Sequence, residues 1–125
     1  MHRYSMSSAD HDYLASDRRA MVGGAAAAAE YGHGGQAVPG EAHLYMASEL
    51  HRSFDGLVAA LPDPLGSVVV RVVPDDMWES VYSLGESELD GRRKLAPPAA
   101  VALDLMESGD PRHWVAAEEL IGVRG

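Results

Sequence analysis

Six histidines are the residues of this 125-residue chain best suited to binding a metal ion. His33, His43 and His51 lie close in sequence, but none has an i, i+4 partner with a helping carboxylate, and no H-E-x-x-H motif occurs. The triplet 10–12 (DHD) places consecutive side chains in a polar segment, where they do not converge on one ion. Cysteine is absent, which excludes thiolate ligands, thiolate nucleophiles and disulfides. We therefore expect neither a metal nor a cofactor.

Carboxylates are the next candidates for chemistry. Three close pairs occur, Asp75-Asp76, Glu86/Glu88 and Glu118-Glu119. Acid–base catalysis needs two carboxylates in different environments facing one pocket, whereas neighbouring side chains point apart and stay solvated. Asp104 differs because it stands in the middle of an apolar helical segment. We expect it to form a structural ion pair with Arg112 or with the basic segment 92–94.

The remaining catalytic motifs are missing. Gly23-Gly24 precedes an alanine run, but the other glycines of G-x-G-x-x-G and a P-loop lysine do not follow, so close backbone packing explains the pair better than phosphate binding. No G-x-S-x-G elbow activates a serine. The sequence indicates that this protein is not an enzyme.

The charge balance favours a protein partner over nucleic acid. With 19 acidic against 10 basic residues, the net charge is −9, whereas nucleic-acid affinity needs a basic face. We expect the acidic side chains of one loop and of the last helix to contact a basic partner: Glu86, Glu88, Asp90, Glu118 and Glu119. The single basic cluster, Arg92, Arg93 and Lys94, is typical of a solvated loop. No signal-peptide or membrane-spanning stretch is present, which favours a cytoplasmic location.

The elements that must position these residues follow from periodicity and turn signals. Residues 1–16 are expected to form a flexible tail and residues 17–125 a single domain. Strands are predicted at 42–46 and 67–73, with further strands open at 18–22 and 92–96. Helices are predicted near 24–31, 48–61, 98–108 and 111–121, with Ser48 and Asp110 as N-caps.

This mixture predicts an α/β (α+β) fold, in which a small mixed sheet of three to four strands is covered by helices and the chain ends in a helical hairpin. Strand order cannot be derived from the pattern. The predicted core consists of Phe54, Leu57, Val68, Val70, Val72, Leu103 and Met106. The last helix is predicted to bury Trp114, Ala117, Leu120 and Ile121.

Taken in order, four segments resemble the C-terminal region of AbiEi-type proteins: MVGGAAAAAEYG, AHLYM, GSVVVRVVPDDMW and APPAAVALDLMESGDPRHWVAAEELI. These are the antitoxin and autoregulator halves of type IV toxin–antitoxin pairs, whose partner is a nucleotidyltransferase-like toxin. The resemblance covers residues 18–122 and is most specific over 96–121. It implies a non-enzymatic regulatory domain that acts by protein–protein contact.

One departure from the family pattern affects the expected partners. Such proteins usually begin with a winged helix-turn-helix, for which this sequence has no room, and the basic recognition helix is also missing. The resemblance therefore implies the partner-facing domain without direct nucleic-acid binding, in a protein whose DNA-binding segment is truncated or is supplied by another subunit. The alternative function is a small-molecule-binding module, with pockets at the Gly23-Gly24 or Val73–Asp76 junctions. The oligomeric state is not predicted.

Overall fold

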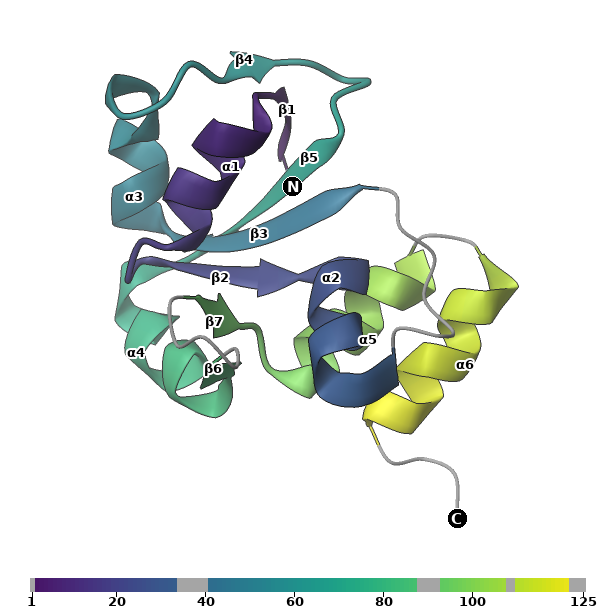
Figure 1. Ribbon diagram of the computed structural model, residues 1–125. Helices are drawn as coiled ribbons and strands as arrows, with labels where there is room; N and C mark the ends of the chain where they lie inside the picture. The colour runs from purple at the N-terminus through teal and green to yellow at the C-terminus, as the bar shows by residue number, and fades with distance from the viewer. Residues whose placement is uncertain (1, 34–40, 88–92, 108–109, 122–125) are drawn as a thin grey trace.

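The computed structural model describes residues 2–33, 41–87, 93–107 and 110–121, which form one mixed sheet with helices packed against it (Figure 1). The described part of the chain has seven strands, in the order β4-β1-β5-β3-β2-β7-β6. Their bounds are β1 (His2–Ser5), β2 (Ala20–Gly23), β3 (Ala42–Ala47), β4 (Leu61–Pro62), β5 (Val68–Val73), β6 (Glu86–Ser87) and β7 (Lys94–Leu95). The predicted mixed α/β class is confirmed, although the sheet has more strands than expected.

The centre of the sheet consists of β3 and β5, which run parallel with Ala42 opposite Val68 and Ala47 opposite Val73. β2 runs antiparallel to β3 on its other side. The strands predicted at 42–46 and 67–73 are confirmed, and the two further positions left open at 18–22 and 92–96 contain β2 and β7, which belong to the same sheet. The carboxyl ends of β3 and β5 and the amino end of β2 therefore meet at one edge of the sheet.

The helices are α1 (Ser8–Ala15), α2 (Gly24–Ala28), α3 (Ser48–Ser53), α4 (Asp75–Leu84), α5 (Pro98–Glu107) and α6 (Pro111–Leu120). A π-helical segment, η1 (Ala29–His33), follows α2, and a 3-10 turn, η2 (Phe54–Gly56), follows α3. The predicted hairpin of α5 and α6 is confirmed. Asp110 caps α6 as expected, because its carboxylate accepts the backbone N–H of Arg112. Figure 1 shows α2 packed beside this hairpin, with α1 and α3 together at the opposite end.

The segment expected to be a flexible tail is instead part of the fold. β1 pairs antiparallel with β5, with Arg3 opposite Val69, and so continues the sheet beyond its central strands. α1 begins after Ser7, whose hydroxyl accepts the N–H of Asp10, and it fully buries Leu14 and Ala15. Neither element was predicted, because the segment is polar and lacks periodicity. Pairing with β5 stabilises β1, and the local sequence does not indicate that pairing.

The helix predicted over 48–61 is shorter than expected. It ends at Ser53, and its N-cap is Ala47 rather than Ser48. Phe54 and Val58 are buried as the periodicity indicates, but Leu57 and Leu61 are exposed because the helical face is not continued. The segment after the second central strand forms α4, a helix that sequence analysis did not predict.

The buried faces of the last two helices differ from the predicted ones by about one residue. In α5, Leu103 is 59% exposed, while Asp104 and Leu105 are buried. In α6, His113 and Ala117 are buried, while Trp114 and Ile121 are largely exposed. Val68 and Val70 belong to the core as predicted, and Val72 and Met106 pack partly buried against it. The reason for the rotation of α5 lies in the polar contacts of Asp104.

Candidate functional site

Asp104 is a fully buried carboxylate that links three elements. Its Oδ2 accepts the backbone N–H of Gly24 at 3.0 Å, at the start of α2. Its Oδ1 accepts the hydroxyl of Tyr45 from β3 and the Nε of Arg71 from β5, both at 2.8 Å. α5 therefore turns Asp104 toward the sheet because three donors meet there, and the apolar side chain of Leu103 is left outside.

The charge of Asp104 is balanced by Arg71. Arg71 also donates through its second nitrogen to Glu107, one helical turn further along α5, at 2.6 Å. Burial raises the pKa of Asp104 above its usual 3.8, although these hydrogen bonds and charges favour the carboxylate. The pKa of Tyr45 is raised as well, by burial and by the nearby carboxylate.

His43 completes this buried cluster. Its Nδ1 is buried without a hydrogen-bond partner and lies 3.7 Å from the carboxylate of Asp104. Burial lowers the pKa of His43 below 6.5, against the opposing effect of Asp104. The imidazole is therefore neutral near pH 7, and it does not share the ion pair of Asp104 with Arg71.

The glycine pair is explained by the same cluster. A Cβ on Gly23 would lie 2.6 Å from Asp104 Oδ2, and Gly24, at φ +63°, would bring a Cβ 2.6 Å from the ring of His43. The prediction of close backbone packing is confirmed. The carboxylate of Asp104 occupies the start of α2, so the backbone N–H of Gly24 is already bonded within the protein.

The predicted ion pair of Asp104 is confirmed in kind, but its partner is Arg71. Arg112 instead pairs with Asp110, at 3.0 Å. Both Arg71, within a valine strand, and Asp104, within an apolar helix, are visible as exceptions in the sequence. The sequence does not indicate what brings Arg71 and Asp104 together, which is the parallel pairing of β3 with β5 and the rotation of α5.

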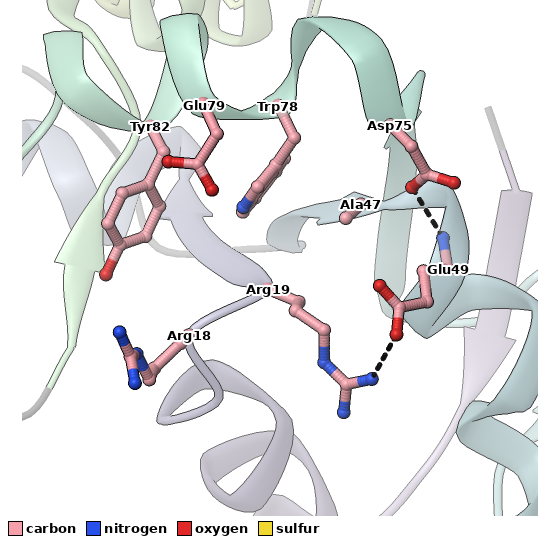
Figure 2. A pocket seen from close by; sticks show the side chains of 8 residues that line it. All are labelled: Arg18, Arg19, Ala47, Glu49, Asp75, Trp78, Glu79 and Tyr82. Atoms are coloured by element: carbon pink, nitrogen blue, oxygen red, sulfur yellow. Dashed lines mark hydrogen bonds and ion pairs between the residues drawn. The ribbon is translucent and has the colours of Figure 1, made fainter.

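An open pocket of about 370 Å³ lies at the other predicted junction, where the carboxyl ends of β3 and β5 meet the amino end of β2 (Figure 2). We call it the strand-end pocket. It is lined by Arg18, Arg19, Ala47, Glu49, Asp75, Trp78, Glu79 and Tyr82. Ligands of open α/β sheets commonly bind outside the carboxyl ends of parallel strands.

Several charges of the strand-end pocket are already neutralised. Arg19 forms two hydrogen bonds of 3.0 Å with Asp17, which hold the pKa of Asp17 below its usual range. Asp75 accepts the N–H of Glu49 at 2.9 Å, and this bond, together with Arg52, lowers the pKa of Asp75. These pairs fix the geometry of the pocket rim.

The predicted partner-binding residues do not form one continuous surface in the described structure. Glu86 is exposed in β6 at the edge of the sheet, and Glu118 is exposed on α6. Figure 1 shows β6 and α6 apart, with α2 and α5 between them. Glu119 is half-buried, whereas Glu88 and Asp90 lie outside the described residues.

The basic cluster is placed only in part. Arg92 lies outside the described residues, and Arg93 is half-buried. Lys94 belongs to β7, where its Nζ lies 4.8 Å from the ring centroid of Tyr82, beside the strand-end pocket. The structure thus places this lysine on an aromatic ring, a contact that no pattern in the sequence predicts.

Metal clusters and membrane spans are absent from the part of the chain that the structure describes. Within residues 2–33, 41–87, 93–107 and 110–121, no three His, Asp or Glu side chains are grouped to hold a metal ion. None of the helices in the same ranges has the length and apolar character needed to cross a bilayer.

Comparison with known proteins identifies a family. The family model described as "Transcriptional regulator, AbiEi antitoxin, Type IV TA system" matches residues 4–122. No curated protein and no solved structure matches the chain significantly. The family match begins in β1 and continues past the end of α6, so it includes the N-terminal elements as well as the cluster around Asp104.

Proposed function

The chain belongs to the AbiEi antitoxin family of type IV toxin–antitoxin transcriptional regulators, and from this premise we propose that it acts as a non-enzymatic antitoxin-type regulator through protein–protein contact. The observation that carries the proposal is the family match over nearly the whole chain. The partner is a nucleotidyltransferase-like toxin in the same cytoplasm, or a winged-helix subunit that supplies DNA contact. A net charge of −9 suits a basic partner, because opposite charge speeds encounter and disfavours wrong partners.

We place the principal contact on the outer face of α6. Trp114, 48% exposed, is followed at i+4 by the exposed Glu118 and at i+7 by the exposed Ile121. Residues at this spacing share one face of a helix. An exposed tryptophan bordered by a carboxylate is typical of a binding hot spot with a polar rim. The acidic segment 86–90 is proposed as a second, separate contact.

The test begins with affinity capture of the tagged full-length chain from its native host and identification of the bound protein. A nucleotidyltransferase-like protein or a winged-helix subunit is the expected result. The purified partner is then titrated with two variants: Trp114→Ala is expected to weaken binding at least about 30-fold, and Glu118→Lys at least about tenfold.

Asp12→Lys provides the matched control. Asp12 lies on α1, at the end of the molecule opposite α6, and its side chain is 71% exposed. Its charge reversal should leave affinity unchanged. Equal affinities for wild type, Trp114→Ala and Glu118→Lys would show that α6 is not the contact.

A growth assay separates the antitoxin role from the contact mechanism. Co-expression of this chain with the toxin is expected to restore growth, and Trp114→Ala is expected to lose that protection while its circular dichroism stays native. Restored growth without any detectable complex would contradict neutralisation by contact, although the antitoxin role would stand. Failure to restore growth would contradict the antitoxin role itself.

A further inference from the structure

The strand-end pocket contains two charged side chains of opposite sign that have no partner among the described residues. Arg18 precedes β2, and Glu79 lies on α4; both are exposed and both line the pocket. The other charges of the rim differ, since Arg19 pairs with Asp17 and Asp75 pairs with Arg52. One guanidinium and one carboxylate are therefore left to a ligand.

The wall between these charges is aromatic. Trp78 and Tyr82 lie with ring centroids 5.7 Å apart, and Figure 2 shows both rings facing the space that Glu79 and Arg18 border. The indole N–H of Trp78 has no acceptor among the described residues. The pocket thus offers a cation, an anion, a free donor and an apolar surface.

We propose that the strand-end pocket binds a free α-amino acid with an apolar or aromatic side chain. The carboxylate of the ligand pairs with Arg18, whose planar guanidinium suits bidentate binding of a carboxylate. The ammonium group pairs with Glu79. The side chain lies against Trp78 and Tyr82, where burial of apolar surface adds affinity.

The size and charge of the pocket favour this class over larger anions. A volume of about 370 Å³ stands near the lower end of the range for small-molecule pockets. Three carboxylates, Glu49, Asp75 and Glu79, line the pocket beside two arginines. A phosphate dianion would meet repulsion from Glu79, whereas an amino acid satisfies that carboxylate with its own ammonium group.

The test is calorimetric titration of the full-length protein with phenylalanine, leucine, N-acetylphenylalanine and phenylalaninamide, and with inorganic phosphate and AMP as separate probes. Phenylalanine is expected to bind at least about tenfold more tightly than the acetylated compound, which lacks the ammonium group, and than the amide, which lacks the carboxylate. Stronger binding of phosphate or AMP than of any amino acid would overturn the proposal, as would no binding of any amino acid at millimolar concentration.

Two variants assign each charge to its partner. Arg18→Gln should bind phenylalanine and phenylalaninamide with about equal affinity. Glu79→Gln should bind phenylalanine and N-acetylphenylalanine with about equal affinity. Asp76→Asn, on the same helix but outside the pocket lining, should keep both preferences. Retention of both preferences in the pocket variants would also overturn the proposal. The α6 variants should bind phenylalanine normally, so this test succeeds or fails independently of the proposed partner contact.

Discussion

At the scale of single residues, Asp104 anchors α5 on the sheet, a task that buried apolar side chains perform elsewhere in the helix. Its carboxylate is completely buried, which is costly unless donors replace water. Gly24, Tyr45 and Arg71 supply those donors from α2, β3 and β5. Removal of one partner from such a group leaves a buried charge, so the cluster fixes the position of α5 on the sheet.

His43 gives this cluster a dependence on pH. Its folded-state pKa is lowered by burial, so between that value and 6.5 the unfolded chain binds more protons than the native protein. The contribution of His43 to stability is therefore expected to fall as the pH is lowered from about 7.5 to about 5.5, by at most about 1.4 kcal/mol for each unit by which burial lowers its pKa. Urea unfolding at a series of pH values measures this slope.

His43→Gln is the variant that identifies the source of the slope. It removes the titrating group and keeps a polar side chain, so its stability should fall less than that of wild type as the pH is lowered over the same interval. Asp104, whose raised pKa acts in the opposite direction, remains in both proteins. Parallel curves for wild type and His43→Gln would show that His43 does not contribute to the slope.

At the scale of elements, the orientation of α5 can be tested with two leucines two residues apart. Leu103 is 59% exposed and Leu105 is 1% exposed. Leu105→Ala is expected to cost about 2–5 kcal/mol of unfolding free energy, because it leaves a cavity. Leu103→Ala should stay within about 0.5 kcal/mol of wild type, since alanine favours helix and most of the leucine side chain is already exposed to solvent. Chemical denaturation of both variants gives the comparison, and a larger loss for Leu103→Ala would reverse the assigned face.

Some elements could be predicted from the sequence and others could not, for a physical reason. The segment Val68–Val73 and the helix starts at Gly24, Pro98 and Pro111 were predictable, because β-branched runs, capping residues and prolines act locally. β1 and α1 were not, because their stability comes from pairing with β5 and from burial of Leu14. The buried face of α5 was not predictable either, because a hydrophobic pattern places an aspartate such as Asp104 on the solvent-exposed side of a helix.

The candidate sites show the same division. The Val73–Asp76 junction was predictable as a pocket position because it follows a buried strand, and the structure has a pocket there. Arg18 and Glu79 were not predictable as its free charges, since they come from segments far apart in sequence. Only the register of β2 against β3, with Ala20 opposite Met46, brings Arg18 to the edge from which α4 begins.

At the scale of the whole molecule, the charges are distributed unevenly along the chain. Arg18, Arg19 and Lys94 lie at the strand-end pocket together with Glu49, Asp75 and Glu79, so opposite charges balance there, whereas the exposed end of α6 carries Glu118. The excess of acidic residues in the chain is therefore not concentrated at the pocket rim. A basic partner approaching by diffusion would be guided by the excess of negative charge, to which Glu118 on α6 contributes.

This distribution predicts how salt affects partner binding. Because the attraction acts over distances that salt screens, raising NaCl from about 50 to about 500 mM should slow association about tenfold or more and change dissociation much less. Stopped-flow mixing with the captured partner measures both rates. Glu118→Lys should reduce the dependence of the association rate on salt, whereas Trp114→Ala should keep that dependence and speed dissociation, because its contact is short-ranged and apolar. An association rate that does not change with salt would remove charge steering from the mechanism and leave the exposed tryptophan as the principal determinant of binding.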